Sequence, residues 1–254
     1  MSQVLSTINN HVMTISINRV EKKNALTLAM YQDMADALVH ANDNESVKVV
    51  LIKGEGEAFT AGNDIEYFAQ RRDGDTIAEI NAFMQALATC TCPVVAEVRG
   101  VAVGIGTTLL LHCDLVYSAP NTRFCLPFIN LGLVPEYASS YILPRIAGRR
   151  KASEWLMLGE AFGADEALQF GILTDIVPAD KLTDTVQAVC NKLAAKPVFA
   201  LQHTKQLMSN EHDAIEKQIS AELDVFLEAL ASDAAKEAFD AFLNKRPVNT
   251  KKFK

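Results

Sequence analysis

The chain lacks any apolar run long enough to cross a membrane. A transmembrane helix needs about 20 apolar residues in a row, and no stretch of these 254 residues reaches that length. The opening segment, MSQVLSTINNHVMTISIN, also lacks the basic region followed by an apolar stretch that is typical of a secretory leader. We therefore expect a cytoplasmic protein that has no membrane partner.

Positive charge is scarce as well. The chain has 24 lysines and arginines against 31 aspartates and glutamates, which gives a net charge of −7. Nucleic acids attract proteins that carry an excess of positive charge, so no nucleic-acid partner is expected. Basic residues cluster at Arg19, Lys22 and Lys23 and again within 245–254, where an ordinary solvated surface explains them as well as a binding site does. Any polyanionic ligand must therefore be bound locally.

Cysteine and histidine show none of the spacings that hold metals. The cysteines are odd in number and have no paired spacing of a disulfide framework or a zinc site. The triplet His112-Cys113-Asp114 lies where an apolar helix is expected to meet a buried strand, so core packing explains it better than metal binding. We expect no metal site, and reduced thiols at Cys90, Cys92, Cys113, Cys125 and Cys190.

The first half of the chain alternates strands with helices. Alternating apolar residues in 4–17 predict a hairpin, and apolar residues at helical spacing after Thr27 predict a helix that leads to a buried strand over 47–54. Similar patterns predict a helix over 76–89, a strand over 94–98, a helix over 107–112 and a strand over 114–119. Strands and helices in this order indicate stacked parallel β-α units and an α/β fold.

Past Ala179 the strand patterns end. The segments that predict helices are 180–195, 197–209, 212–231 and 233–244. Their apolar side chains exceed what a small appendage can bury by itself, so we expect these helices to pack on the body or on another subunit. The sequence therefore divides into a core over 1–195 and a helical region over 196–254.

Two glycine-containing turns stand where strands are expected to lead into helices: residues 59–64 (FTAGND) and 100–106 (GVAVGIG). Such turns present free backbone N–H groups at a helix start, where anions bind. The second turn lacks the third glycine of a dinucleotide fingerprint and the Gly-Lys-Ser/Thr ending of a phosphate-binding loop. Glycine packing without function explains their spacing at least as well as a paired anion site does.

These segments resemble the paired oxyanion-hole motifs of the crotonase (enoyl-CoA hydratase/isomerase) superfamily, and the resemblance extends over nearly the whole chain. Single motifs are weak, whereas the set in this order is highly specific. The matching motifs are Arg-x-x-x-x-Asn-Ala-Leu (19–26), AGND (61–64), GVAVGIG (100–106), HCD (112–114), the Pro127 and Gly132-Leu133 stretch, FGADEALQFGILTDIV (162–177) and Phe-x-x-Lys-Arg-Pro (242–247).

The resemblance implies a fold and an oxyanion site. The fold is a stacked ββα spiral core, with C-terminal helices that build homotrimers or dimers of trimers. The peptide N–H groups of Ala61 and Ile105 would bind the thioester oxygen of an acyl-CoA, and Gly62 and Gly104 would let the backbone approach it. Coenzyme A is then part of the substrate, and no separate cofactor is expected.

The resemblance also separates hydratases from isomerases. Family members that hydrate a double bond have two glutamates at positions that match Thr108 and Phe128 here. Neither of these residues activates water as a carboxylate does, so two-acid hydration is not expected. The segment LVPEYASSY (133–141) is similar to peroxisomal-type Δ3,Δ2-enoyl-CoA isomerases, which makes Glu136 the predicted acid-base residue and Phe128 a wall of the acyl pocket.

The predicted substrate contacts lie in two segments. Arg19, Lys22, Lys23 and Ala25 occupy the loop that resembles the family's nucleotide-contact segment, and Lys245-Arg246 are expected to reach the same phosphates. Asn63 is expected to shape the pocket and Asp64 to cap a helix. The charged segment 66–76, which includes Arg71 and Arg72, shows no apolar periodicity and is predicted to form a mobile wall of the acyl pocket.

Two other functions fit the same sequence. A different enolate reaction, such as thioester hydrolysis, dehalogenation or decarboxylation, would use Glu136 in another role. A binding or scaffold protein that has lost catalysis would retain affinity for coenzyme A without turnover.

Overall fold

The computed structural model describes residues 2–70, 77–209 and 211–253. Its central element is a six-stranded sheet, in which the first two strands pair antiparallel and every later neighbour pairs parallel. In spatial order the strands are β1 (Val4–Asn9), β2 (Val12–Ile17), β3 (Val49–Gly54), β4 (Val94–Val98), β6 (Leu115–Ser118) and β9 (Asp175–Ile176).

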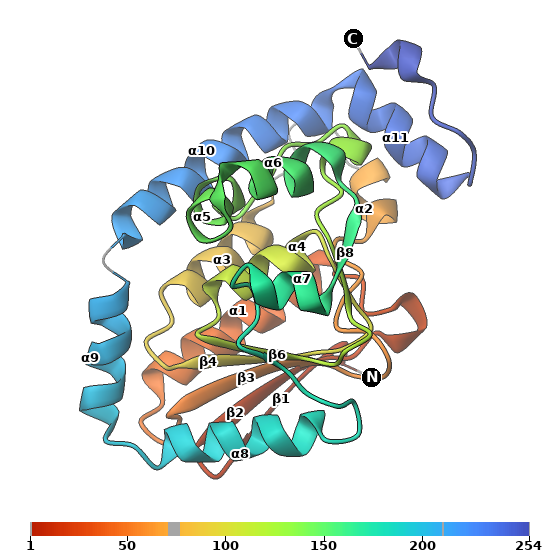
Figure 1. Ribbon diagram of the computed structural model, residues 1–254. Coiled ribbons are helices and arrows are strands. Elements are labelled where there is room, and N and C mark those ends of the chain that lie inside the picture. Colours follow the sequence, from red (N-terminus) through yellow and green to blue (C-terminus); the bar gives the residue numbers. More distant parts are fainter. Residues whose placement is uncertain (1, 71–76, 210, 254) are drawn as a thin grey trace.

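Helices cover both faces of this sheet (Figure 1). Helices α1 (Leu28–Asp43) and α3 (Ala78–Ala88) pack against each other on one face, and α8 (Leu182–Ala194) runs along the other. The Thr27 hydroxyl accepts a hydrogen bond from the Met30 N–H and so caps α1. Because β3 and β4 are buried on both faces, their sequences are continuous apolar runs.

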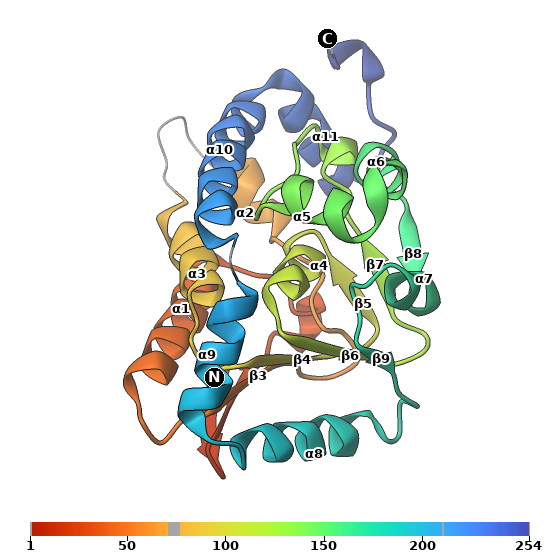
Figure 2. The same ribbon diagram turned by 60° about the vertical axis from the view of Figure 1, so that its left-hand side comes forward.

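A second, three-stranded sheet stands above the first and carries the second glycine turn (Figure 2). It consists of β5 (Val101–Val103), β7 (Arg123–Cys125) and β8 (Ala161–Gly163). The short helix α4 (Ile105–Thr108) follows β5 after one glycine, and a 3-10 helix (Leu109–His112) continues it. The predicted helix over 107–112 therefore exists as two shorter pieces.

Several short elements escaped the sequence prediction. They are too short to show a helical or strand period, or they interrupt it with proline or glycine. Besides the small sheet, these are α6 (Gly148–Leu158), α7 (Ala164–Gln169) and the 3-10 helices at Val20–Lys22, Ile129–Leu131 and Thr250–Lys252. Helices α2 (Ile65–Gln70) and α5 (Ser139–Ile146) begin where helices were expected, after Asp64 and after Glu136.

The C-terminal helices agree with their predicted ranges. They are α9 (Val198–Met208), α10 (His212–Ala231) and α11 (Asp233–Leu243). Helix α10 lies beside α5 (Figures 1 and 2), and α11 lies against α2 and the 3-10 helix at Ile129–Leu131. These contacts bring the last helices onto the strand-to-helix turns. They do not test the predicted division at residue 195 or the predicted oligomer.

The main hydrophobic core consists of buried side chains from the large sheet, from α1 and α3, and from residues 124–143. All five cysteines are free, and three of them are buried. Within the described ranges, no helix has both the length and the apolar character needed to span a bilayer.

Candidate active site

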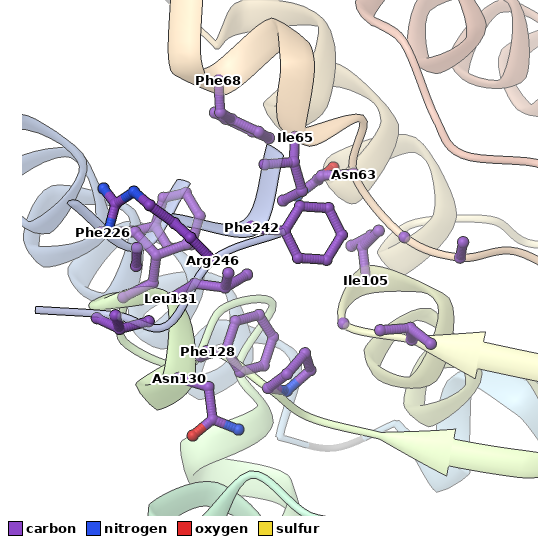
Figure 3. A pocket seen from close by; sticks show the side chains of 18 residues that line it. Asn63, Ile65, Phe68, Ile105, Phe128, Asn130, Leu131, Phe226, Phe242 and Arg246 are labelled. Atoms are coloured by element: carbon purple, nitrogen blue, oxygen red, sulfur yellow. The ribbon is translucent and has the colours of Figure 1, made fainter. Parts of the chain in front are cut away.

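A cavity of about 400 Å³ lies between the two glycine turns and the C-terminal helices (Figure 3). The turns contribute Asn63, Gly104 and Ile105 to its wall, and α10 and α11 contribute Phe226 and Phe242. The remaining lining is mostly apolar and includes Ile65, Phe68, Phe128, Leu131 and Leu133. A site of this kind fits an apolar ligand whose polar group meets the backbone of the two turns.

The two turns touch through their glycines. Gly62 has a φ of +85°, and a Cβ atom placed there would lie 2.5 Å from the carbonyl oxygen of Val103. Gly104 has a φ of +55°, and the small bridge between Thr60 and Ala102 keeps the two segments aligned. Glycine adopts a positive φ without steric cost and, having no Cβ, allows the close backbone approach that a larger residue would block. The sequence predicted both glycines, and the structure brings them together.

The free peptide N–H groups of the turns differ from those predicted at one position. The N–H of Ala61 donates to the carbonyl of Lys23 over 2.9 Å, so the predicted oxyanion role of Ala61 is wrong for this structure. Among the described residues, the N–H groups of Asn63 and Ile105 have no acceptor, and both residues line the cavity. Each directly follows a glycine of positive φ, Gly62 or Gly104, which turns the next peptide away from its neighbours.

The side chain of Asn63 is held from α1. The hydroxyl of the buried Tyr31 donates to Oδ1 of Asn63. Burial raises the pKa of Tyr31 well above its usual value, so the phenol stays protonated as a donor. This contact fixes the residue whose N–H faces the cavity.

Arg19 and Asp64 form an ion pair inside the loop instead of facing solvent. The Arg19 guanidinium lies 2.6 Å from Asp64 and also donates to the Ala25 carbonyl over 3.0 Å. Oδ1 of Asp64 accepts from the Glu66 N–H at 3.0 Å, which confirms its predicted role as a cap, here for α2. The polar atoms of Arg19 and Asp64 thus hold this loop together, and their predicted contacts with substrate stay predictions.

The remaining basic residues differ in their exposure and in their ion pairs. Lys22 pairs with Glu66 on the exposed surface, and Lys23 is exposed in a left-handed conformation. Arg246 binds Glu237 and Asp240, so its guanidinium is already neutralised although the residue lines the cavity. The predicted phosphate contacts of Lys22, Lys23 and Arg246 stay predictions.

Glu136 is a buried carboxylate with one close side-chain partner. Its residue is 2% exposed, and the Thr108 hydroxyl donates to its Oε1 over 2.5 Å. Burial raises the pKa of Glu136 to about 8, the Thr108 hydrogen bond opposes that rise, and the charge of Glu222 adds to it. Glu136 thus exchanges a proton near neutral pH, as a general acid-base residue must.

The segment after Glu136 is strained. Tyr137 and Ala138 have φ values of 58° and 55°, which a side chain disfavours. The buried Tyr137 hydroxyl donates to the Met84 carbonyl over 2.8 Å, and the Tyr137 ring stacks on His112. Burial lowers the pKa of His112 to about 4, so a neutral imidazole donates from Nε2 to the Tyr137 carbonyl. The structural role predicted for His112 is confirmed, and strain of this kind is typical of functional sites.

The predicted residues do not all meet in one wall. Phe128 lines the cavity as expected, whereas Thr108 and Glu136 lie outside the lining that the described residues form. Thr108 ends the helix that Ile105 begins, so the Glu136 carboxylate lies about one helical turn behind that wall. Of the predicted mobile wall, Phe68 lines the cavity from within helix α2, and residues 71–76 fall outside the described residues.

No metal centre competes with this site in the part of the chain that the structure describes, since no three His, Cys, Asp or Glu residues cluster there. The predicted cluster at 112–114 is structural throughout. Asp114 pairs with Lys205 over 2.7 Å and accepts from the Val94 N–H.

Comparison with known proteins shows the family and the fold of this chain. Residues 7–252 match the family model described as enoyl-CoA hydratase/isomerase. The structure of an enoyl-CoA hydratase/isomerase from Pseudoalteromonas atlantica T6c is similar with a TM-score of 0.92 and 34% identity, covering 98% of this chain and 99% of that chain. The predicted α/β fold with its C-terminal helices is confirmed.

Relatives of known activity include both isomerases and hydratases. The 1,2-epoxyphenylacetyl-CoA isomerase of Escherichia coli K12 is 32% identical, covering 97% of each chain, and the 2,3-dehydroadipyl-CoA hydratase of the same organism is 30% identical, covering 99% of each. Enoyl-CoA delta isomerase 2 of Rattus norvegicus is 31% identical over 96% of this chain and 64% of its own. This chain belongs to the enoyl-CoA hydratase/isomerase family, the crotonases.

Proposed function

We propose that this crotonase is an enoyl-CoA isomerase that moves a double bond from C3 to C2 of an acyl-CoA. The family implies an acyl-CoA substrate. The observation that carries the choice of isomerase is Glu136, which is buried, has a pKa of about 8 and is paired with a threonine hydroxyl instead of a second carboxylate. One titratable group suits a reaction that removes one proton and returns one.

The reaction begins with removal of a proton from C2 by the Glu136 carboxylate. The electron pair of that C–H bond forms the enolate of the thioester, with its negative charge on the carbonyl oxygen. The protonated Glu136 then returns a proton to C4, and the double bond comes to lie between C2 and C3. Atoms and charge balance within the substrate and this one side chain.

The two free peptide N–H groups stabilise the enolate in this proposal. The N–H groups of Asn63 and Ile105 both face the cavity without an acceptor in the described structure. Donors fixed in place before the reaction stabilise developing charge without reorganising, and one such donor contributes about 2.7–4 kcal/mol in known enzymes. The largely apolar wall strengthens the effect, because it keeps the local dielectric low.

Hydration is disfavoured by the two positions at which the hydratase pattern places its glutamates. Phe128 stands in the cavity wall, and Thr108 donates a hydrogen bond to Glu136. Neither side chain binds and deprotonates water as a carboxylate does.

The mechanism requires the Glu136 carboxylate to contact the acyl chain. That carboxylate lies behind the helical turn that begins at Ile105, so substrate binding must bring the acyl carbons past this turn or rotate Glu136 toward them. Catalytic contacts commonly tighten only when substrate is bound.

Product analysis tests the proposal. The enzyme is incubated with a 3-enoyl-CoA in deuterated and ordinary water, and products are identified by chromatography and mass spectrometry. A 2-enoyl-CoA of unchanged mass in ordinary water supports isomerisation. A product that has gained the mass of water would indicate a hydratase, and release of free thiol would indicate thioester hydrolysis. Binding without reaction would indicate a non-catalytic binding protein.

Two further expectations belong to the same proposal. Lys22 and Lys23 remain available to the phosphates of coenzyme A on the exposed loop.

Self-association into a trimer or a dimer of trimers is supported by apolar side chains that the single chain leaves exposed on α9, where Phe199 is 73% and Leu207 is 79% exposed. Sedimentation of the purified protein tests the oligomer.

A further inference from the structure

A second buried carboxylate, Glu222 on α10, contacts the segment that carries Glu136. Glu222 is 6% exposed, and its Oε1 accepts from the Ser140 N–H at 3.0 Å and from the Ser140 hydroxyl. Its Oε2 is buried and has no hydrogen-bond partner in the described structure. Burial of a carboxylate that no cation balances costs several kilocalories per mole, so its presence calls for a compensating role.

Glu222 supplies what helix α5 lacks at its start. The residue before the helix, Ala138, has no side chain that caps it, and its own conformation is left-handed. A carboxylate placed from α10, 82 positions along the chain, accepts the Ser140 N–H of the first turn and complements the positive end of the helix. Gln218, one turn earlier on α10, also donates to the Ser140 hydroxyl over 3.0 Å.

The same contact controls the geometry around Glu136. The Glu136 carbonyl accepts from both the N–H and the hydroxyl of Ser139, so Glu136 joins α5 through Tyr137 and Ala138. Two consecutive left-handed residues revert to ordinary conformations unless neighbours hold them. Glu222 holds this segment at its C-terminal end, as the Tyr137 hydroxyl does at its centre.

Charge adds to geometry. The titratable groups that face Glu136 are Glu222 from α10, Tyr31 from α1 and the adjacent Tyr137. Burial raises the pKa of both tyrosines well above their usual value, so they stay neutral. Burial also raises the pKa of Glu222, but the hydrogen bonds from Ser140 stabilise its ionised form and oppose that rise, so Glu222 is the group that brings charge. No lysine or arginine within the described chain pairs with either carboxylate.

We propose that Glu222 is a positioning residue for Glu136, which holds through Ser140 the left-handed segment that carries the catalytic carboxylate. This rests on the proposed role of Glu136 as the acid-base residue. Glu222 has a second effect, because its negative charge disfavours ionisation of Glu136 and keeps a proton available for return to C4.

Two variants separate position from charge. Glu222→Gln keeps an acceptor for the Ser140 N–H and removes the charge, whereas Glu222→Ala removes both. Glu228→Gln, an exposed residue on the same helix, is the matched control. Far-UV circular dichroism of each full-length variant verifies folding. If Glu222→Ala does not fold, Ser140→Ala removes one of the two hydrogen bonds and is expected to show the same effects more weakly.

Two readouts are independent of activity. The Glu136 carboxyl carbon is titrated by ¹³C NMR, with its resonance assigned from Glu136→Gln, and amide exchange of the peptide spanning 136–143 is followed by mass spectrometry. We expect Glu222→Gln to move the Glu136 titration to lower pH without faster exchange. We expect Glu222→Ala to accelerate exchange, and Glu228→Gln to change neither.

Kinetics then connect the residue to the reaction. Glu222→Gln should move the acidic limb of the kcat/KM profile to lower pH and raise kcat/KM at pH 6.5 by about twofold or more. Glu222→Ala should lower kcat about tenfold with a smaller effect on KM. Unchanged exchange in Glu222→Ala overturns the positioning role, and an unchanged Glu136 titration in Glu222→Gln overturns the effect of charge. Absence of isomerase activity in the wild type, with both NMR and exchange effects present, overturns the proposed function alone.

Discussion

The Thr108 hydroxyl donates a hydrogen bond to Glu136 over 2.5 Å inside the protein. A threonine thus occupies the position at which the hydratase pattern places a glutamate, and it serves the remaining glutamate as a donor. The buried carboxylate of Glu136 therefore has an uncharged hydroxyl, and not a second carboxylate, as its close partner. A donor to a carboxylate stabilises its ionised form, so Thr108 limits how far burial raises the pKa of Glu136.

Replacement of Thr108 by valine should raise the pKa of Glu136 further, because the donor to the ionised form is lost. The acidic limb of the kcat/KM profile should then move to higher pH, and activity at pH 7 should fall by roughly tenfold. The direction is opposite to that expected for Glu222→Gln. Thr108→Ser keeps the hydroxyl and should retain the wild-type profile. Identical profiles for the valine and serine variants would show that the hydrogen bond does not tune the base.

Glu136→Gln should stabilise the folded protein at high pH. The folded-state pKa of Glu136 is raised to about 8 from a usual value of 4.5, so folding is penalised as the pH rises from the lower value to the higher one. The variant escapes this penalty, which is on the order of 5 kcal/mol above pH 8. Thermal melting at pH 5 and pH 8.5 should show a Tm gain for the variant that grows with pH. An equal gain at both values would argue against a strongly raised pKa.

Gly62→Ala should separate the two cavity turns. The added Cβ would meet the Val103 carbonyl oxygen at 2.5 Å and would stand on a φ of +85°. Since the N–H groups of Asn63 and Ile105 depend on this approach, we expect a rate loss on the order of 10²-fold with a smaller change in KM. Gly148→Ala, which has open space around its Cβ and also a positive φ, is the matched control for backbone strain. Equal losses in both variants would point to strain alone.

Arg19 and Lys23 should respond differently to the phosphates of coenzyme A. Lys23→Ala should weaken binding of coenzyme A several-fold, and less so binding of dephospho-coenzyme A, because an exposed cation is lost. Arg19→Gln breaks the ion pair with Asp64 and should lower Tm without changing the ratio of the two affinities. Calorimetric titration with both ligands measures that ratio. A changed ratio of the two affinities in Arg19→Gln would support the predicted contact of Arg19 with a phosphate.

Much of this site was readable from the sequence, and the exceptions have definite physical causes. The two glycine turns and Glu136 carry distinctive motifs, so each was predicted at its residue. Which peptide N–H faces the cavity depends on the φ of the preceding glycine. The family resemblance placed the donor at Ala61, whereas the free N–H belongs to Asn63. The burial of Arg19 against Asp64 joins residues 45 positions apart and leaves no local pattern.

The small elements were missed for a different reason. Strands of three residues such as β5 and β7 contain too few side chains to establish a period of two. A helix was expected to follow Glu136, but the two left-handed residues before α5 and the Pro144 inside it leave no local signal for where that helix begins and ends. The contact of Glu222 with Ser140 was not predicted, because it joins α10 to the first turn of α5 across 82 positions of the chain.

The central claim is that Glu136 carries the proton in an isomerisation. The most direct measurement is the steady-state rate of conversion of a 3-enoyl-CoA to the 2-enoyl isomer by the wild type, by Glu136→Gln and by the exposed control Glu228→Gln. The account predicts that Glu136→Gln binds the acyl-CoA, remains folded and loses on the order of 10²-fold or more in kcat, while the control keeps its rate. A folded Glu136→Gln variant with the wild-type rate would contradict the account.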